Sequence, residues 1–284
     1  MDILWLGEPA CHDPAVVGGK AAQLSRLAAG YPVPPGFCLP AARAAVSGDA
    51  LAAAYRELGA RCGESDPAVA VRSSRLDEDG AAASFAGQHE TYLNVRGLEA
   101  VAAAVARCRE SGRATRAVAY RQARGLASEP AVAVLVQALV AADVSAVVFS
   151  AHPVTGDRDT VVVTASWGLG ESIVGGTATP DTWTVCKADL VIRDAVIGEK
   201  ARMTVAAPDG AREVDTPRFL RAQPALPDER VRELARLALA LEASAGWPVD
   251  LECAYRGDAL ALLQCRPITT LRAVAGDGAE RPAR

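Results

Sequence analysis

Residues 250–267 read DLECAYRGDALALLQCRP and decide the fold prediction for this 284-residue chain. Apolar and polar residues alternate on either side of Gly257-Asp258-Ala259, which predicts two strands joined by a three-residue hairpin loop. Side chains on a strand point alternately to opposite faces, so this loop would bring four polar residues together in two facing pairs. The pairs are Glu252 with Gln264 and Asp250 with Arg266. The buried face would hold Leu251, Cys253, Ala261, Leu263 and Cys265.

The four polar residues of this hairpin have the chemistry of a nucleotide site. Carboxylates are ligands of Mg²⁺, and an arginine side chain can bind a phosphate with two parallel hydrogen bonds. The patch therefore predicts the metal and phosphate end of a nucleotide site. Taken alone, the same residues fit an amphipathic edge hairpin with a solvated charged face equally well.

The bulk composition excludes several classes of partner. Half of the residues are hydrophobic, which allows a substantial core in one large or two smaller domains. The formal net charge of −4 provides no broad basic surface, so we expect no nucleic acid and no membrane as partner. Aromatic residues make up only 5% of the chain, which argues against base stacking as a main binding principle.

The cysteines and the N-terminus indicate the compartment. The seven cysteines are odd in number and form no C-x-x-C pair, which argues against a disulfide framework and against a zinc knuckle. The chain begins without the basic flank and long apolar run of a signal peptide, and no apolar run reaches the roughly 18 residues of a membrane span. We therefore expect a cytoplasmic protein.

Apolar periodicity predicts both helices and strands. Helices are expected at residues 18–29, 41–46, 49–58, 98–109, 115–124 and 227–245. Strands are expected at residues 68–72, 131–137, 145–149, 160–165, 182–186 and 190–193, besides the hairpin. The two types mix without strict βαβ alternation, which favours an α+β fold of two lobes.

Two further segments have features of phosphate binding. Gly18-Gly19-Lys20 is expected to open a helix, where free N–H groups, the helix dipole and the lysine could bind one anion. Val71-Arg72-Ser73-Ser74 is expected to lead from a strand into a loop of small residues, which could lie close over phosphates. An ordinary turn and an ordinary flexible loop are the competing interpretations.

Two more segments are less specific. The apolar strand within residues 133–140 ends in a linker whose backbone groups could read an adenine edge, although core packing explains such a strand as well. The glycine-dense loop at residues 167–176 matches neither a dinucleotide fingerprint nor a P-loop.

In their order along the chain, these segments resemble the N-terminal ATP-binding domain of the phosphoenolpyruvate synthase, pyruvate phosphate dikinase and rifampin phosphotransferase family. The resemblance covers nearly the whole chain. The segments that carry it are Val17-Gly18-Gly19-Lys20, Val33-Pro34-Pro35-Gly36-Phe37, Val71-Arg72-Ser73-Ser74, Ala83-Ser84-Phe85-Ala86-Gly87-Gln88, Val144 to Gly156, Ala165-Ser166-Trp167-Gly168-Leu169-Gly170-Glu171 and Gln264-Cys265-Arg266-Pro267-Ile268-Thr269.

The resemblance implies an ATP-grasp-like fold in which two lobes hold ATP between them. It places one nucleotide-binding unit at residues 1–272, with a hinge near 136–140, and we expect a disordered tail at 273–284. Lys20 and Arg72 would be cationic clamps on the phosphates. Backbone groups of Gln137, Ala138 and Leu139 would bind the adenine.

The resemblance also assigns roles within the closing hairpin. Glu252 and Gln264 would place Mg²⁺ and the phosphate chain. Asp250 and Arg266 would complete the cluster, with Arg266 stabilising charge on the transferred group. Phosphoryl transfer depends on electrostatic positioning more than on a covalent protein group, so these residue types suit an ATP-dependent kinase.

The chain departs from the family pattern in one segment, where glycine, threonine and asparagine are usual. It has Ala146, Ser150 and His152 at those positions. We interpret His152 as a hydrogen-bonding surface residue of a turn rather than as a catalytic group.

Full-length members of the family carry a mobile domain whose histidine accepts phosphate from ATP. The chain ends about where that domain would begin, and none of His12, His89 and His152 has the sequence context of the carrier. Three hypotheses follow: direct transfer to a small-molecule acceptor, with nitrogen as a reasonable target atom; transfer to a histidine on a separate carrier protein; and a non-catalytic ATP-binding module. The presence of the whole set of transfer residues argues against the third.

Overall fold

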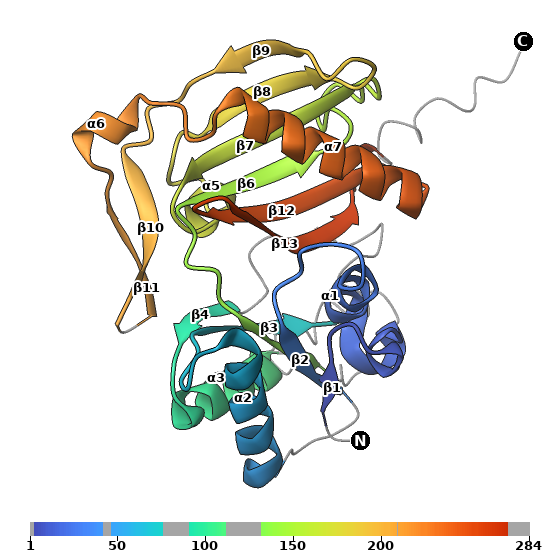
Figure 1. The fold of residues 1–284 in the computed structure, drawn as a ribbon, viewed down its shortest axis with the longest axis vertical. Coiled ribbons are helices and arrows are strands. Elements are labelled where there is room, and N and C mark those ends of the chain that lie inside the picture. Colours follow the sequence, from blue (N-terminus) through green and yellow to red (C-terminus); the bar gives the residue numbers. More distant parts are fainter. Residues whose placement is uncertain (1–2, 42–46, 76–90, 112–131, 209, 272–284) are drawn as a thin grey trace, which may run out of the picture. The chain divides into compact units, whose positions relative to one another are not determined.

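Helices and strands mix irregularly along the computed structural model, which describes residues 3–41, 47–75, 91–111, 132–208 and 210–271. Contacts divide the chain into two units (Figure 1). Unit 1 comprises Met1–Val140 with Ala206–Arg212, and unit 2 comprises Ala141–Val205 with Glu213–Arg284. The mixture of helices with antiparallel sheets confirms the predicted α+β class.

Unit 1 contains a five-stranded antiparallel sheet in the order β1-β2-β5-β3-β4. Its strands are β1 (Leu4–Trp5), β2 (Gly36–Leu39), β3 (Val69–Ser74), β4 (Thr91–Val95) and β5 (Ala133–Ala138). Its helices are the 3₁₀ helix η1 (Pro9–Cys11), α1 (Pro14–Leu27), α2 (Gly48–Cys62) and α3 (Leu98–Ser111).

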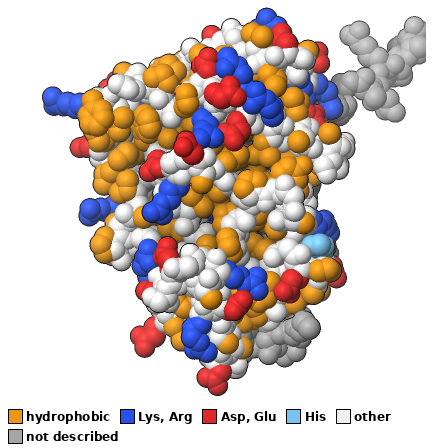
Figure 2. All heavy atoms as spheres, viewed as in Figure 1, with side chains coloured by type: hydrophobic (Ala, Val, Ile, Leu, Met, Phe, Trp, Pro, Cys, Tyr) orange, Lys and Arg blue, Asp and Glu red, His pale blue; other side chains and the backbone are white. Residues whose placement is uncertain are grey.

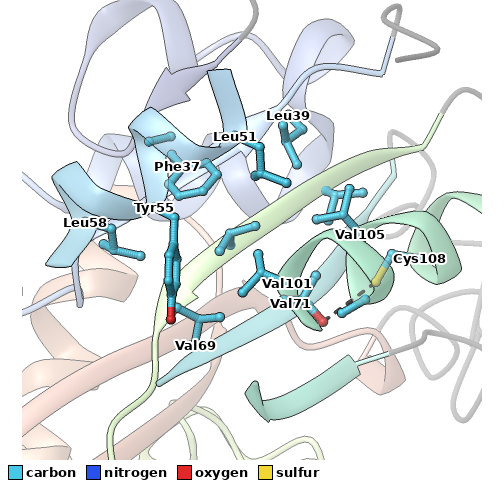
Figure 3. Packing of buried hydrophobic residues seen from close by; sticks show 14 residues of the cluster. Phe37, Leu39, Leu51, Tyr55, Leu58, Val69, Val71, Val101, Val105 and Cys108 are labelled. Atoms are coloured by element: carbon cyan, nitrogen blue, oxygen red, sulfur yellow. Dashed lines mark hydrogen bonds between the residues drawn. The ribbon is translucent and has the colours of Figure 1, made fainter. Parts of the chain in front are cut away.

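Both faces of this sheet are covered, because successive strand residues point to opposite sides. Val69 and Val71 of β3 pack with α2 and α3 in one apolar cluster (Figure 3). Leu135 of β5 packs with α1 in a second cluster. It follows that Ala70, Arg72 and Ser74 of β3 point to the α1 side.

Unit 2 contains a six-stranded antiparallel sheet in the order β13-β12-β6-β7-β8-β9. Its strands are β6 (Val144–Phe149), β7 (Thr160–Trp167), β8 (Asp181–Cys186), β9 (Ile192–Val196), β12 (Val249–Arg256) and β13 (Ala259–Pro267). The helices of this part are α5 (Glu171–Val174), α6 (Arg218–Arg221) and α7 (Asp228–Ala245). The strands β10 (Arg202–Ala207) and β11 (Gly210–Asp215) form a separate two-stranded hairpin.

Helix α7 covers one face of the six-stranded sheet (Figure 1). Its sequence predicts this, since apolar residues recur at helical spacing and Pro227 and Gly246 bound the segment. Gly246 takes the left-handed conformation, with φ of 76°, that ends helices. Over α7, Figure 2 shows basic and acidic side chains intermixed, and the ion pairs there include Arg232 with Asp228.

Several predicted elements differ from the structure. The helix predicted at 18–29 begins at Pro14 instead, because Asp13 caps it by accepting a hydrogen bond from the Ala15 N–H. The strand predicted at 190–193 starts later, at Ile192, since Leu190 has a positive φ of 57° in the preceding turn. The helix predicted at 115–124, residues 42–46 of the helix predicted at 41–46, and residues 273–284 of the expected tail lie outside the described residues.

Candidate functional site

The closing hairpin has the predicted facing pairs at the site but not the predicted loop. Arg256 pairs with Ala259, so the loop has two residues, Gly257 and Asp258, rather than three. If the strands paired regularly from this two-residue loop onward, Glu252 would lie opposite Leu263 instead of Gln264. A bulge after Glu252 restores the register, because β13 has one more residue than β12 at this point. The resulting pairs are Asp250 with Arg266 and Glu252 with Gln264.

The bulge also changes which residues of β13 are buried. Leu263 was predicted to be buried but is only half-buried, whereas Leu262, which pairs with Cys253, is completely buried. On β12, the Tyr255 hydroxyl donates to Glu233 of α7 over 2.9 Å, so the odd-numbered positions face α7. Asp250 and Glu252 therefore lie on the opposite face of the sheet.

Asp250 is the most unusual group on that face. It is 6% exposed, and its Oδ2 accepts a 2.7 Å hydrogen bond from Arg266 Nε. Its Oδ1 is buried and accepts no hydrogen bond from the described residues. Burial raises the pKa of the carboxyl, the Arg266 guanidinium opposes this rise, and Glu252 adds to it. A buried carboxylate oxygen without a donor fits a position that a cation or a donor group would occupy.

Arg266→Ala should make stability depend more steeply on pH. Without the guanidinium, the pKa of Asp250 should rise further above its ordinary value, because its main opposing charge is lost. The folded state then binds a proton more tightly than the unfolded state, so the free energy of unfolding should fall as pH rises through the carboxyl range. Urea denaturation between pH 4 and pH 7 measures how steeply the unfolding free energy changes with pH, and the unmutated chain is the control. An unchanged slope would show that the pair is not coupled.

The strands beside the carboxylates provide a mainly apolar surface. Val147 of β6 lies opposite Glu252, and Phe149 of β6 lies opposite Asp250. On β7 the next neighbours are Thr164 and Val162. Val147, Phe149 and Thr164 are only partly covered, so the charged residues stand at the edge of an accessible and weakly polar sheet face.

In unit 1, the structure brings the Lys20 segment and the Arg72 segment together. Helix α1 is interrupted at Gly18, where φ is 78°, and the helix resumes at Gly19 and Lys20. The Gly19 N–H donates to the Arg75 carbonyl over 2.9 Å, and the Ala21 N–H donates to Ser74 Oγ over 3.1 Å. Two of the N–H groups predicted to bind an anion therefore hold the end of β3.

These contacts place Lys20 and Arg72 on the same side of unit 1. Ser74 points to α1, and Arg72, two residues earlier on the same strand, points the same way. The two segments that carry the proposed phosphate clamps are thus in contact, although Lys20 and Arg72 are 52 residues apart in sequence. The loop predicted after Ser74, with Ala83 to Gln88, lies outside the described residues.

Gly18→Ala should strongly destabilise unit 1. A Cβ at Gly18 would lie 2.4 Å from the backbone carbon and oxygen of Ser74, and alanine disfavours a φ of 78°. Backbone shift and strain together should cost about 2–4 kcal/mol in unfolding free energy. Urea denaturation measures the loss, with Gly48→Ala as control because a Cβ at Gly48 would have no neighbour within 4 Å. Equal stability of the two variants would contradict the close approach.

The predicted adenine strand has fewer free donors than expected. The Ala138 N–H donates to the Pro35 carbonyl over 2.8 Å, and the Leu139 N–H donates to the Ala68 carbonyl over 2.9 Å. Gln137 is 1% exposed, and its amide donates to the Pro34 carbonyl over 3.1 Å. A base at this strand end would thus be read by carbonyl groups, or by an N–H beyond Leu139.

The three departures from the family pattern have structural roles. Ala146 is buried in β6 opposite Ala165 of β7. Ser150 is completely buried, and its hydroxyl accepts a 2.8 Å hydrogen bond from the Val249 N–H at the start of β12. His152 Nδ1 accepts hydrogen bonds of 3.2 Å from the N–H groups of Val154 and Thr155. These bonds keep the proton of neutral His152 on Nε2, which leaves no nitrogen lone pair for attack on phosphate.

His152→Asn should therefore keep both the turn and the phosphate transfer, because an asparagine carbonyl oxygen can accept the same backbone N–H groups. His152→Ala removes the acceptor and should cost about 1 kcal/mol of unfolding free energy, without abolishing transfer. Thermal denaturation and ATP turnover of both variants test this. Loss of turnover in both variants, with stability kept, would instead identify His152 as a reacting group.

The described residues fit a metal site in which the ion is held by the protein together with the phosphates of ATP, rather than a site made of protein ligands alone. They contain no group of three or more His, Cys, Asp or Glu side chains that could hold a metal ion. Mg²⁺ in nucleotide sites is usually held by one or two carboxylates together with the phosphates, so Glu252, Gln264 and the unbonded Asp250 oxygen are a suitable set. None of the described helices is both long and apolar enough to cross a membrane.

Comparison with known proteins identifies the family. Residues 44–282 match the family described as "Pyruvate phosphate dikinase, AMP/ATP-binding domain". A "Probable phosphoenolpyruvate synthase" of Methanocaldococcus jannaschii is 36% identical over 318 residues, which cover 95% of this chain and 27% of that protein. The "Prodigiosin synthesizing transferase PigC" of Serratia marcescens is 37% identical over 287 residues, covering 91% of this chain and 32% of PigC.

A third relative, the "Uncharacterized phosphotransferase YvkC" of Bacillus subtilis, is 41% identical over 209 residues, which cover 73% of this chain and 25% of YvkC. The chain thus spans about a quarter to a third of the length of these three relatives. The family match extends over most of the sequence and includes the closing hairpin. The chain therefore belongs to the family of the AMP/ATP-binding domain of pyruvate phosphate dikinase.

Proposed function

We propose that this chain binds Mg-ATP and transfers a phosphoryl group from it directly to a small-molecule acceptor, with nitrogen as the attacked atom. The observation that carries the proposal is the pairing of Asp250 with Arg266 and of Glu252 with Gln264 on one accessible sheet face. Family membership supports ATP as the donor. The finding that His152 Nδ1 is held as an acceptor argues against that histidine as the phosphate acceptor.

Each proposed residue has a role that follows from its chemistry. Lys20 and Arg72 of unit 1 would bind phosphate oxygens and hold the triphosphate, since cations offset the charge of the phosphates. In unit 2, Glu252 and Gln264 would hold Mg²⁺. When bound, Mg²⁺ neutralises charge on the phosphate oxygens.

Asp250 and Arg266 would act as a pair. The 2.7 Å hydrogen bond from Arg266 Nε to Asp250 Oδ2 would fix the orientation of the guanidinium, whose positive charge would stabilise the phosphoryl group in transfer. In the transfer, the bond between the γ-phosphorus and the bridging oxygen breaks, the acceptor nitrogen bonds to phosphorus, and ADP leaves. The acceptor nitrogen gives up its proton to water.

A second candidate acceptor is a histidine on a separate carrier. It is favoured by the similarity to a protein named a probable phosphoenolpyruvate synthase, since full-length members of that family carry a histidine that accepts phosphate. Under this alternative the chain alone should show little turnover, and it should release AMP when two phosphates are used.

Nucleotide analysis after incubation with ATP and Mg²⁺ separates the two acceptors. Candidate metabolites that carry a guanidine or an amide are added in one arm, and the products of neighbouring genes in the other. ADP formed with a metabolite alone supports direct transfer. AMP formed only with a histidine-bearing partner would overturn it, and ATP that binds without turnover in either arm would indicate a non-catalytic module.

A further inference from the structure

We infer that unit 2 contains a second binding site, for a small organic anion that carries a carboxylate or phosphate group. The site is an open cleft of about 550 Å³ that is lined by residues after β9 and by residues of the short helix α6 and its end. Figure 1 shows the positions of β9 and α6 in the fold. This volume is in the range of about 300–1,000 Å³ that small-molecule sites occupy. Its lining residues are Ile197, Gly198, Glu199, Arg218, Arg221 and Ala222.

The floor of this anion cleft is held rigidly. A Cβ on Gly198 would lie 2.2 Å from the Thr179 carbonyl oxygen, so only glycine fits at this position. The Gly198 N–H donates to Asp181 Oδ1 over 2.9 Å, and Lys200 Nζ donates to the Gly198 carbonyl over 2.9 Å. Asp181 and Lys200 are both completely buried and form an ion pair beneath the cleft. A site built on such a floor does not have to order its backbone when a ligand binds.

Arg221 is oriented before any ligand arrives. Its Nε donates to the Thr216 carbonyl over 2.9 Å, and its own carbonyl accepts from the Lys200 N–H over 3.0 Å. The side chain is half-buried, and its two terminal amino groups make no hydrogen bond to the described residues. A guanidinium held in this way can bind a carboxylate or phosphate with two hydrogen bonds at little entropic cost.

The positive charge in the cleft is only partly compensated by the described residues. Other described arginines, such as Arg202 and Arg230, pair with carboxylates. Among the described residues, no carboxylate forms an ion pair with Arg218 or Arg221. Glu199 is the only acidic residue among the described residues of the lining, which together carry two positive charges and one negative charge. An anion of one or two charges would complete this set.

The other lining residues narrow the class of ligand. The Glu199 carboxylate can accept a hydrogen bond from a hydroxyl or amino group of the ligand, and Ile197 offers an apolar contact. A short organic acid or phosphate ester that also carries a hydroxyl or amino group could bind the arginines, donate to Glu199 and contact Ile197. A highly charged anion would be repelled by Glu199.

Isothermal titration calorimetry without ATP tests the site, with inorganic phosphate, succinate and malate as probes. Malate and succinate differ by one hydroxyl, so Glu199 should favour malate. Arg218→Ala, an exposed position, should weaken binding of each probe about tenfold, and Arg218→Ala with Arg221→Ala should abolish it. Arg158→Ala, an exposed residue of unit 2 outside the cleft, is the matched control and should bind normally.

Glu199→Gln provides the sharpest test. Removing the one negative charge of the lining should tighten phosphate binding several-fold, whereas a merely structural Glu199 would give no change or weaker binding. Thermal denaturation of each variant checks that the protein remains folded. Equal affinity of the Arg218→Ala variant and the unmutated chain, or unchanged or weaker phosphate binding after Glu199→Gln, would overturn the inference. Glu252→Gln should leave probe binding unchanged, so failure here is distinct from failure of the ATP-dependent function.

Discussion

Glu252→Gln should lower ATP-dependent phosphate transfer by about 10²- to 10³-fold, while the protein stays folded. Glutamine has the shape of glutamate but no charge, so the variant removes the negative charge of the proposed metal ligand and keeps the packing. Glu252 faces Gln264 across the hairpin and stands beside Val147 on an accessible sheet face, where an amide is readily solvated. The loss should appear in kcat and should be only partly restored by excess Mg²⁺.

A matched control exists in the same hairpin. Asp258 in the two-residue loop is completely exposed, and its ion pair with Arg230 lies at the surface. Asp258→Asn removes one carboxylate from the hairpin without touching the site, so turnover should remain normal. ATP turnover and thermal denaturation of both variants complete the comparison. Near-normal turnover of the Glu252→Gln variant would show that the metal end of the site is elsewhere.

Lys200→Met should lower the free energy of unfolding by about 3–5 kcal/mol. Lys200 and Asp181 are both completely buried, and Lys200 Nζ lies 2.5 Å from Asp181 Oδ1. Asp181 also accepts hydrogen bonds from the backbone N–H groups of Gly198 and Ala225. Methionine has a similar volume but no charge, so the variant leaves the Asp181 carboxylate buried without its counter-ion.

A comparison with Lys187 shows whether burial of the ion pair causes the loss of unfolding free energy after Lys200→Met. Lys187 pairs with Glu242, but these two side chains are 17% and 22% exposed. Lys187→Met should therefore cost much less, about 1 kcal/mol or below. The double change Asp181→Asn with Lys200→Met should recover part of the loss, because it removes the unpaired charge. Urea denaturation measures all three variants. A loss after Lys200→Met that is no larger than after Lys187→Met would contradict a buried, uncompensated charge.

The candidate site was predictable from sequence where apolar and polar residues alternate along a strand, because this alternation shows which side chains share a face. The pairing of Asp250 with Arg266 follows from the period of a strand, and it is correct even though the loop is shorter than predicted. The sequence analysis predicts one residue too many in the loop and no bulge in β13. These two errors cancel, because the bulge at Leu263 adds to β13 the residue that the loop lacks. No local pattern distinguishes a three-residue loop from a two-residue loop followed by a bulge.

Other features of the structure had no local signal in the sequence. The interruption of α1 at Gly18 depends on the close approach of Ser74, which is distant in the sequence. The loss of free N–H groups at Ala138 and Leu139 depends on how β5 continues beside Pro35 and Ala68. The buried pair of Lys200 and Asp181 was also missed, because both residues lie in segments that look like ordinary polar loops and strand ends.

The sequence by itself therefore determined the α+β class, the amphipathic helices such as α7, and the two facing pairs of polar residues in the closing hairpin. These properties depend on the spacing of apolar residues within one segment. The tertiary structure alone decided the order of the strands, the contact of Gly19 with Arg75, and the isolation of the Asp250 Oδ1 oxygen. The physical reason is that hydrogen bonding and desolvation of a group depend on which distant residues surround it, and spacing along the chain does not specify those residues.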